Sequence, residues 1–327
     1  MKTRGIIESC LVLMVVLWGS PASALFGFGP KTFQGAYSKG AKARIEFRVV
    51  DDTGCPVKGA NVNVSFDMAD RGEGRRVIGI TDTNGVCVIE GKTVGVLKIE
   101  VSCQGYYRTK DELCFITMGH EHEVKNGKWQ PWGMEKKIVL RPVRCPRAIR
   151  MRSHDWIDTK AINEWLGFDL EKYDFIAPIG KGLVKDVEIK FDWDGCYGTK
   201  HNGMALSLRF PSPYAGGYYE NKTAWSDFTG VYNANTNGIY SQEFHYERRP
   251  IRDAKGRIVG GVGDKFDQAK VLVVRSRCIV DRQGILVSAR YFLLSNLEFS
   301  CMPDGYVSIR FVTTYNPTPN DTNLEPK

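Results

Sequence analysis

Histidine and acidic side chains are the first candidates for chemistry in this chain. Two of its five histidines lie in the run GHEHE at 119–123. On an extended strand His120 and His122 would share one face, as metal ligands can, and His120 with Glu123 has the H-x-x-E spacing of zinc sites. The histidines show no zincin spacing beyond this run. We therefore expect a solvated, charged loop here and predict no metal site.

Other catalytic motifs are missing or incomplete. The chain has no G-x-S-x-G, and the glycines at 180–182 lack the spacing and the following helix of a phosphate-binding loop. Asp192 and Asp194 are not part of a twelve-residue calcium loop, so a strand-end turn is the better interpretation. Carboxylate pairs such as Glu243 and Glu247 do not define a glycosidase. The sequence therefore predicts no catalytic residue and no cofactor.

Aromatic side chains are concentrated at 211–246, among Asn, Ser, Thr and Gly. Flat rings beside amides and hydroxyls are typical of sugar-binding surfaces, because pyranose faces pack on aromatic planes. The alternative is that these rings fill a core or stiffen long loops. The candidate ligand-binding residues are Tyr218, Tyr219, Trp225 and Tyr232.

Four arginines recur at every third residue between 141 and 150, with two prolines among them. Proline favours the polyproline II conformation, which has three residues per turn, so the guanidinium groups would line one ridge. Such a ridge could hold an anionic polymer, a phospholipid headgroup or an acidic protein face. A solvated strap between domains is the alternative. The candidate anion-binding residues are Arg141, Arg144, Arg147 and Arg150.

Residues 1–24 have the pattern of an export signal. A basic start precedes a short apolar run at 11–18, and small residues at 22–24 form an A-x-A cleavage site. The apolar run is too short to span a bilayer, and no later stretch is suited to do so. A lipid anchor at Cys10 is the rival interpretation. We expect an exported protein in the periplasm, on the cell surface or secreted.

Eight of the nine cysteines follow this segment. An even number in an exported chain suggests disulfide bonds, with the connectivity left open. Buried, reduced thiols are the alternative. No C-x-x-C occurs, which argues against a redox or zinc-ribbon motif. The candidate disulfide cysteines are Cys55, Cys87, Cys103, Cys114, Cys145, Cys196, Cys278 and Cys301.

The formal net charge of +8 is mildly basic. No RNP, helix-turn-helix or zinc-finger pattern accompanies this charge, so we predict no nucleic-acid partner. The apolar content, 43% of residues, is that of a globular protein with a real core. The chain length suits two domains.

Short alternating runs broken by turns fill 44–106, which predicts a small antiparallel sandwich. Ile45, Phe47 and Val49, for example, alternate with charged residues. A tight turn is predicted at 82–85, where Asn-Gly supplies the positive φ that hairpins need. The predicted strands lie at 44–49, 62–66, 77–80, 86–88, 94–101 and 137–140.

Three motifs here resemble the carboxypeptidase-regulatory-like, or transthyretin-like, β-sandwich module. They are V-x-D-x-G-x-P-V-x-G-A-x-V at 50–62, T-D-x-x-G at 81–85 and the closing G-Y at 105–106. The resemblance covers about a fifth of the chain. It implies a rigid spacer, adhesion or ligand-carrying module on an exported protein, usually without catalysis. The insertion at 107–132 departs from the compact pattern and leaves the final strand open.

The second half of the chain also has the composition of a β-rich domain. Asp158 or Thr159 caps a predicted short helix that continues to Lys172, and the polar end at 316–327 is expected to be loosely ordered. Strands are predicted at 184–191, 204–210, 270–280, 285–294 and 306–315. The strings DFIAPIGKG and NPTPNDTNLEP resemble exported bacterial proteins of unknown function that also begin with a transthyretin-like module.

These patterns predict a mostly β chain with a signal peptide at 1–24 and a transthyretin-like β-sandwich at 41–142. An Arg/Pro linker at 143–155 and a β-rich domain with one short helix at 156–327 follow. We expect an exported, non-catalytic binding or surface-assembly protein whose partner is an extracellular glycan or cell-envelope component. The alternatives are an extracellular polymer hydrolase with the sandwich as accessory module, and a structural envelope or filament component.

Overall fold

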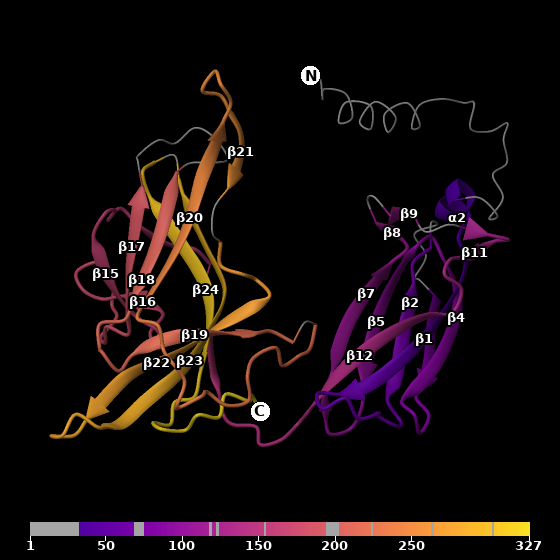
Figure 1. Cartoon of the computed structure of the whole chain (residues 1–327), viewed down its shortest axis with the longest axis horizontal. Helices are drawn as coiled ribbons and strands as arrows, with labels where there is room; N and C mark the ends of the chain where they lie inside the picture. Colours follow the sequence, from indigo (N-terminus) through magenta and orange to yellow (C-terminus); the bar gives the residue numbers. More distant parts are fainter. Residues whose placement is uncertain are drawn as a thin grey trace. The chain divides into compact units, whose positions relative to one another are not determined.

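The computed structural model describes residues 33–68, 75–117, 120–121, 124–153, 155–193, 203–223, 225–262, 265–302 and 304–327. The chain forms two compact units. Unit 1 comprises Met1–Pro142 with Trp225–Asp227, and unit 2 comprises Val143–Ala224 with Phe228–Lys327. Both are built almost entirely of strands, so the predicted mostly β fold class is confirmed (Figure 1).

Unit 1 has two main sheets and one short helix, α2 (Phe33–Lys39). The first sheet has the order β10-β11-β1-β12-β6, with β4 paired to the other side of β1. Its strands are β1 (Ala41–Asp51), β4 (Val86–Thr93), β6 (Tyr106–Tyr107), β10 (Val124–Lys125), β11 (Lys128–Trp129) and β12 (Met134–Pro142). The second sheet, in the order β3-β2-β5-β7, consists of β2 (Asn61–Phe66), β3 (Arg75–Ile80), β5 (Val96–Ser102) and β7 (Thr109–Cys114). A small ladder pairs β8 (Ile116–Thr117) with β9 (His120–Glu121).

Apolar alternation along the strands builds one core between these two sheets. Ile45, Phe47 and Val49 of β1 are fully buried, as are Val62 and Val64 of β2. The strands predicted between residues 44 and 140 are all present. The final one, which the sequence left open, is β12. Much of the insertion at 107–132 is itself sheet, because β7, β10 and β11 extend the two sheets.

The insertion is anchored in the core by Trp129. Its ring is fully buried and stacks on Phe115 with ring centroids 5.4 Å apart. The indole Nε1–H donates to the carbonyl oxygen of Thr93 at 3.0 Å, so the buried donor is satisfied. A buried aromatic ring with its polar atom paired is a strong packing anchor.

A recurring aspartate turn connects strands in both units. Asp51, Asp82, Asp253 and Asp281 each accept, through Oδ1, the backbone N–H groups two and four residues later. A glycine with positive φ, between 72° and 89°, follows each aspartate at the third position. The aspartate replaces a backbone acceptor and glycine adopts the left-handed conformation without strain, which is why D-x-x-G ends these strands.

Unit 2 has two six-stranded sheets. One has the order β13-β24-β23-β22-β19, with β14 also on β24, and the other the order β16-β15-β17-β18-β20-β21. The strands of the first are β13 (Arg150–Ser153), β14 (Ile157–Thr159), β19 (Gly216–Asn221), β22 (Lys270–Val280), β23 (Leu286–Cys301) and β24 (Val307–Tyr315). Those of the second are β15 (Trp165–Asp169), β16 (Asp174–Phe175), β17 (Val187–Trp193), β18 (Met204–Arg209), β20 (Glu243–Arg252) and β21 (Ile258–Val262). Side chains from both sheets form one hydrophobic core.

The short helix predicted from Asp158 or Thr159 to Lys172 is wrong. These residues form β14 and β15, and β15 pairs with β17 along Leu166↔Ile189. In this strand Leu166 and Phe168 are buried in the core, as strand alternation requires. Apolar residues at this spacing fit a helix and a strand alike, and pairing with β17 decides the outcome. The helix of the described chain is α2, in unit 1.

The segment 143–155, predicted to be an extended linker, is bonded in part to other segments of unit 2. Its last part, β13, pairs with β24 in the register Arg150↔Tyr315. Its first part is held by the carboxylate of Glu325, which accepts the backbone N–H groups of Arg144 and Cys145, both at 2.7 Å. The backbone donors of this segment are therefore bound within unit 2 rather than solvated, as a polyproline II strap would require.

The C-terminal end, expected to be loosely ordered, is packed. Leu324 is fully buried in a small cluster with Val273 and Leu293, and Glu325 is only 1% exposed. Asn323 donates from its side chain to the carbonyl oxygen of Cys145 at 2.7 Å. Among the described residues of both units, no helix is long and apolar enough to cross a membrane.

Candidate functional site

Four neighbouring strands of unit 2 carry polar side chains on the sheet face opposite the core. In β17 the buried residues Ile189 and Phe191 alternate with Lys190 and Asp192. Residues directly opposite each other in antiparallel strands share a face, so the register assembles these side chains into rows. One row is Trp165, Lys190, Ser207 and His245; the next is Asp192, Ala205 and Glu247; the third is Glu188, Arg209 and Glu243.

Two hollows lie along these rows and share His245. The larger has a volume of about 460 Å³, and its polar lining is Asn163, Asp192, Trp193, His245, Glu247 and Arg248. The smaller, of about 190 Å³, is lined by Trp165, Ser207, Leu208, Glu243, Phe244 and His245. Because His245 belongs to both, we treat them as one continuous site and call it the His245 groove.

Trp193 is a core residue at the end of β17 that also lines the larger hollow. It is 9% exposed, and its indole Nε1 has no hydrogen-bond partner among the described residues. Leaving such a buried N–H without a partner costs about 1–3 kcal/mol of desolvation free energy. Two other buried side-chain atoms of the described chain, Asn63 Oδ1 and Thr313 Oγ1, share this property, but neither residue lines the groove.

Local structure explains why Trp193 is held at this place. It is the last residue of β17, and its backbone N–H donates to Oδ1 of Asn163 at 3.3 Å. Asn163 has a φ of 61°, a left-handed conformation that asparagine tolerates, and its own N–H donates to the carbonyl oxygen of Phe191 at 2.7 Å. These contacts fix the strand end that carries the indole.

Ser207, His245 and Glu247 form a short chain of contacts in the groove. Ser207 Oγ lies 3.0 Å from His245 Nδ1, and His245 Nε2 lies 3.9 Å from Glu247 Oε2. Serine, histidine and glutamate in this order can form a nucleophile, a base and its orienter. Acyl transfer would also need free N–H donors for an oxyanion, and β18, which carries Ser207, is paired on both sides. The backbone N–H groups of β18 that bond to neighbouring strands are thus not available as such donors.

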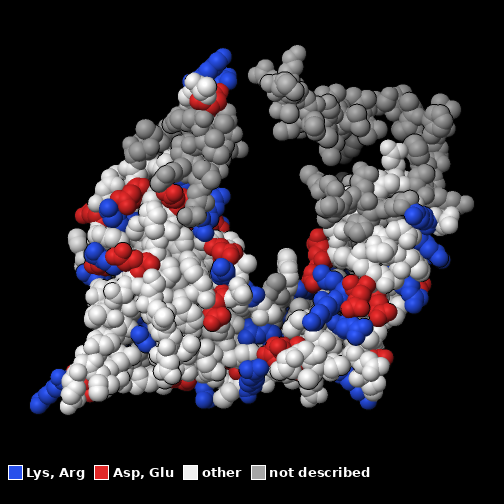
Figure 2. Space-filling model, viewed as in Figure 1, with Lys and Arg blue, Asp and Glu red and all other residues white. Residues whose placement is uncertain are grey.

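The charges on this face are largely balanced by neighbours. Glu188 accepts from Arg209 Nε at 2.9 Å and from Lys185 Nζ at 2.9 Å. Burial alone would raise the pKa of Glu188, but these two cations outweigh it and hold the pKa below its ordinary value. Lys190 contacts Asp192 at 2.6 Å. On the face of unit 2 shown in Figure 2, acidic and basic side chains alternate rather than gather into one patch.

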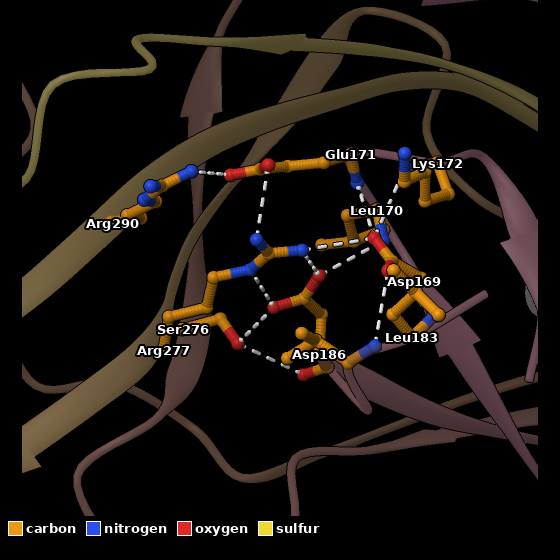
Figure 3. A network of polar contacts seen from close by, with 10 residues as sticks. Asp169, Leu170, Glu171, Lys172, Leu183, Asp186, Ser276, Arg277 and Arg290 are labelled. Carbon is orange, nitrogen blue, oxygen red and sulfur yellow. Dashed lines mark hydrogen bonds and ion pairs between the residues drawn. The ribbon is translucent and has the colours of Figure 1, made fainter.

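A second polar centre of unit 2 is buried, and we call it the Arg277 cluster. It consists of Asp169, Glu171, Asp186, Ser276, Arg277 and Arg290 (Figure 3). Arg277 donates to Asp186 at 3.0 Å from both Nε and Nη2 and to Asp169 at 2.9 Å from Nη2, and its Nη1 lies 3.0 Å from Glu171. Arg290 pairs with the other oxygen of Glu171.

Every carboxylate oxygen of the two buried aspartates has a donor. Asp169 also accepts the backbone N–H groups of residues 171, 172, 183 and 184, and Asp186 accepts that of Leu170 and the hydroxyl of Ser276. Burial raises the pKa of Asp186 despite these bonds. Burial alone would lower the pKa of Arg277, but the neighbouring carboxylates of Asp186 and Asp169 outweigh this effect and raise the pKa. A centre whose buried aspartates have a donor at every carboxylate oxygen is better suited to a structural role than to ligand binding.

The aromatic residues predicted to bind a ligand belong to both units. Tyr219 is 37% exposed, yet Tyr218 and Tyr219 are both bonded through their hydroxyls within unit 2. The Tyr218 hydroxyl accepts the backbone N–H of Asn235 at 2.8 Å, and the Tyr219 hydroxyl bonds to that of Tyr246. Burial raises the pKa of both Tyr218 and Tyr219. Tyr232 lies under the guanidinium group of Arg144 at 4.0 Å. These three rings stiffen unit 2.

Trp225, the fourth predicted residue, is different because its ring is 63% exposed. It belongs to unit 1, where its carbonyl oxygen accepts the backbone N–H of Lys110 at 2.7 Å. The structure therefore places this exposed ring and the other three in different units.

The four arginines predicted to form one ridge are also separated. Arg141 is buried in β12 of unit 1, whereas Arg144, Arg147 and Arg150 belong to unit 2. Arg147 forms an ion pair with Asp321 at 3.5 Å. Because Arg141 is buried, it is not exposed along a ridge with the other three, and Arg150 belongs to a strand that pairs with β24.

Six of the eight candidate disulfide cysteines, Cys55, Cys87, Cys103, Cys114, Cys145 and Cys278, are free thiols in the structure. Burial raises the pKa of the Cys87 and Cys278 thiols. No disulfide bond therefore joins two of these six, and Cys196 lies outside the described residues.

The candidate metal run is mostly outside the described residues. His120 is in β9, whereas His122, Glu123 and Asp194 are not described. Within the ranges given above, no group of three His, Cys, Asp or Glu side chains could hold a metal ion.

Sequence reasoning missed Trp165, Trp193, Ser207 and His245 as site residues. The signal was present as alternation, in EIKFDW at 188–193 and EFHYE at 243–247, where every second residue is polar. Glu243 and Glu247 were noted only as a carboxylate pair, and Asp192 only as part of a turn. The missing information was that β17, β18 and β20 are neighbours in this order.

Comparisons with known proteins do not assign the chain. No family model and no curated protein matches it. Among solved structures, chlorocatechol 1,2-dioxygenase from Pseudomonas putida matches at 13% identity and a TM-score of 0.26, over 31% of this chain and 61% of that one. Catechol 1,2-dioxygenase from Acinetobacter radioresistens matches at 14% identity and a TM-score of 0.25, over 36% of this chain and 58% of that one. Likeness at these scores carries no argument about activity.

Proposed function

We propose that this protein is an exported, non-catalytic β protein whose His245 groove binds a neutral saccharide chain of an extracellular or cell-envelope polymer. The observation that carries the proposal is the unpaired indole N–H of Trp193 in the lining of the groove. A ligand acceptor that pairs with this N–H would remove the cost of leaving it unsatisfied. A sugar hydroxyl is such an acceptor, and it also carries a proton to donate.

The other groups in the groove suit hydroxyls of this kind. Asp192 and Glu247 can accept hydrogen bonds, and Ser207 and His245 can both donate and accept. Lys190 is paired with Asp192, and Glu188 with Lys185 and Arg209, so there is no large excess of one charge. A neutral, hydroxyl-rich ligand fits this balance better than a polyanion does.

The width of the groove also suits a chain rather than a single sugar. It crosses β15, β17, β18 and β20, and strands lie about 4.8 Å apart, so the rows extend for roughly 14 Å. The indole of Trp165 forms part of the wall, with the guanidinium group of Arg209 4.3 Å from its ring centroid. An aromatic wall beside polar groups is the usual composition of a saccharide subsite.

Unit 1 serves in this proposal as the carrier module. Its strands and aspartate turns are accounted for by packing, and its motifs resemble transthyretin-like modules of exported proteins. Residues 1–24 are the proposed signal peptide. Export predicts that the protein purified from the producing cells begins after residue 24, which mass spectrometry of the intact chain measures.

The test is binding of the purified protein to an array of immobilised saccharides. We expect the wild type to bind a neutral polysaccharide and Trp193→Phe to bind it about 3–10-fold more weakly, because one neutral hydrogen bond contributes about 0.5–1.5 kcal/mol. His245→Ala should weaken the same binding. Trp225→Ala is the control, since its exposed ring lies outside the groove lining, and it should bind as the wild type does.

Two outcomes would contradict the proposal. Loss of binding in Trp225→Ala with full binding in Trp193→Phe would move the site to the exposed aromatic residue. Release of new reducing ends from the bound polymer, abolished by Glu247→Gln, would make the protein a glycoside hydrolase and give this carboxylate a catalytic role.

A further inference from the structure

Unit 2 has a second pocket, which we call the Trp156 pocket. It has a volume of about 420 Å³, and its apolar lining is Trp156, Phe266, Leu297 and Phe299. Three of these side chains are nearly buried, with exposed fractions of 3% for Phe266, 2% for Leu297 and 8% for Phe299. This volume and this apolar floor are those of a small-molecule site. The pocket shares only Arg248 with the larger hollow of the His245 groove.

An irregularity in β23 shapes the pocket. The pairing of β23 with β24 shifts register between Ser295 and Glu298, and Asn296 has a φ of 55°. The bulge shifts the alternation of buried side chains by one residue after Leu294, so that Leu297 and Phe299 are buried and line the pocket. Gln268 holds this backbone from outside, because its side-chain amide donates to the carbonyl oxygen of Leu297 at 3.2 Å. Bulges that re-aim side chains in this way are frequent beside binding sites.

Two of the three charged residues that line the pocket are basic. The lining contains one acidic residue, Glu298, and its carboxylate accepts two hydrogen bonds from Arg310, at 2.7 and 3.1 Å. The guanidinium group of Arg310 lies 4.8 Å from the ring centroid of Trp156, so this pair closes one wall as a neutral unit. The remaining charged residues of the lining are Lys265 and Arg248.

The structure assigns to the Trp156 pocket an amphipathic organic anion, with a flat apolar body and one carboxylate or sulfonate group. The apolar body would lie against Trp156, Phe266 and Phe299. The anionic group would be bound by Lys265 and Arg248 at the rim, through charge-assisted hydrogen bonds. This ligand class differs from the neutral saccharide proposed for the groove, and each site can be tested without the other.

Two fluorescent probes that differ only in charge test the assignment. Anilinonaphthalene sulfonate is anionic, and N-phenylnaphthylamine has the same rings without the sulfonate. We expect one site per chain in the folded wild type, with the sulfonate bound at least about 10-fold more tightly than the neutral probe. In Lys265→Gln this preference should fall about 3–10-fold through weaker sulfonate binding alone. Trp156→Ala should weaken the binding of both probes.

Lys58→Gln is the matched control, since it removes an exposed lysine in unit 1 and should leave both affinities unchanged. Thermal unfolding of each variant shows whether the folded state is retained, because anilinonaphthalene sulfonate also binds partly folded protein. Equal affinity for the two probes in the wild type would overturn the assignment. So would a Lys265→Gln variant that keeps the full preference for the sulfonate, or a Trp156→Ala variant that binds both probes as before.

Discussion

The two ends of β17 hold polar groups that are used in opposite ways. Asp186, directly before the strand, belongs to the Arg277 cluster, where each aspartate oxygen has at least one donor. Trp193, the last residue of the strand, lines the His245 groove and has an indole N–H without a partner among the described residues. Both ends are polar and both contain buried atoms, so polarity and burial do not distinguish them. The two ends differ in whether their buried polar atoms have hydrogen-bond partners.

This difference gives a physical criterion for scaffold and site within one β-sandwich. A buried ionic cluster whose lone pairs are all occupied cannot accept a ligand without losing a bond it already has. An unsatisfied buried donor costs free energy in the ligand-free state, and the binding of a ligand recovers that cost. We therefore expect substitutions in the Arg277 cluster to change stability and substitutions in the groove to change binding.

The largest effect is expected for Arg277→Met. This change leaves Asp169 and Asp186 buried without their shared cation, and removing one partner of a buried ion pair typically costs about 3–5 kcal/mol. Urea denaturation measures the free energy of unfolding. Arg44→Met is the control, because Arg44 pairs with Glu90 at 2.7 Å while both side chains are exposed, and such pairs contribute about 0–1 kcal/mol. Equal losses of unfolding free energy in the two variants would mean that the Arg277 cluster contributes no more to stability than an exposed ion pair.

A pair of tryptophan substitutions sharpens the comparison at the level of one N–H group. Trp129→Phe removes a donor that the carbonyl oxygen of Thr93 uses, whereas Trp193→Phe removes a donor that nothing uses. Both lose similar ring volume. We expect Trp129→Phe to reduce the free energy of unfolding by about 1–3 kcal/mol more than Trp193→Phe does. The reason is that only Trp129→Phe takes a hydrogen bond away from a buried acceptor, the carbonyl oxygen of Thr93. Equal losses in denaturant would mean that the Trp193 donor is satisfied.

The pH dependence of stability tests the role of Glu188, the carboxylate on the sheet face that is paired with Lys185 and Arg209. The pKa of Glu188 is lowered in the folded protein, so the native state binds fewer protons than the unfolded state near the ordinary value of 4.5. Its contribution is present above that pH and is lost as pH falls through the lowered pKa. Glu188→Gln should therefore cost about 1–2 kcal/mol at neutral pH and progressively less in acid.

Denaturation curves at several pH values measure this narrowing difference. Glu90→Gln is the control, since Glu90 is exposed and its variant should differ little from the wild type at any pH. A difference between wild type and Glu188→Gln that stays constant into acid would contradict the lowered pKa.

The smallest effect on stability is expected for His245→Ala. The side chain is largely exposed, and substitutions at such positions usually change the free energy of unfolding by less than about 0.5 kcal/mol. A loss of stability above 1.4 kcal/mol, a tenfold change in the folding equilibrium, would show that the groove is held together by this histidine.

The sequence predicted unit 1 better than unit 2, for a physical reason. In unit 1 the residues that make each turn lie within one short motif. D-x-x-G contains both the carboxylate that accepts the backbone N–H groups and the left-handed glycine, so the strand ends at Asp51 and Asp82 can be predicted from the sequence. In unit 2, Glu325 is bonded to residues 144–145, far away along the chain. A segment rich in arginine and proline appeared to be a linker because its acceptors are not local.

The same limit explains the site. Alternation showed that Asp192 and Glu247 lie on strands with a polar face, but only the order β17-β18-β20 brings those faces together. The rings of Tyr218 and Tyr219 had the composition of a sugar platform, yet their hydroxyls bond inside unit 2. Composition identifies which groups can bind a ligand, and the hydrogen bonds decide which ones are left to do so.

The most direct measurement of the central claim is the ¹H–¹⁵N spectrum of the tryptophan indoles. The peak of Trp193 is identified by its absence in Trp193→Phe, and a soluble neutral oligosaccharide of the polymer selected on the array is then titrated in. We predict that the Trp193 Nε1–H peak shifts downfield as it gains an acceptor, while that of Trp129, already bonded to Thr93, stays in place. Saturable binding of the oligosaccharide with an unmoved Trp193 peak would contradict the account.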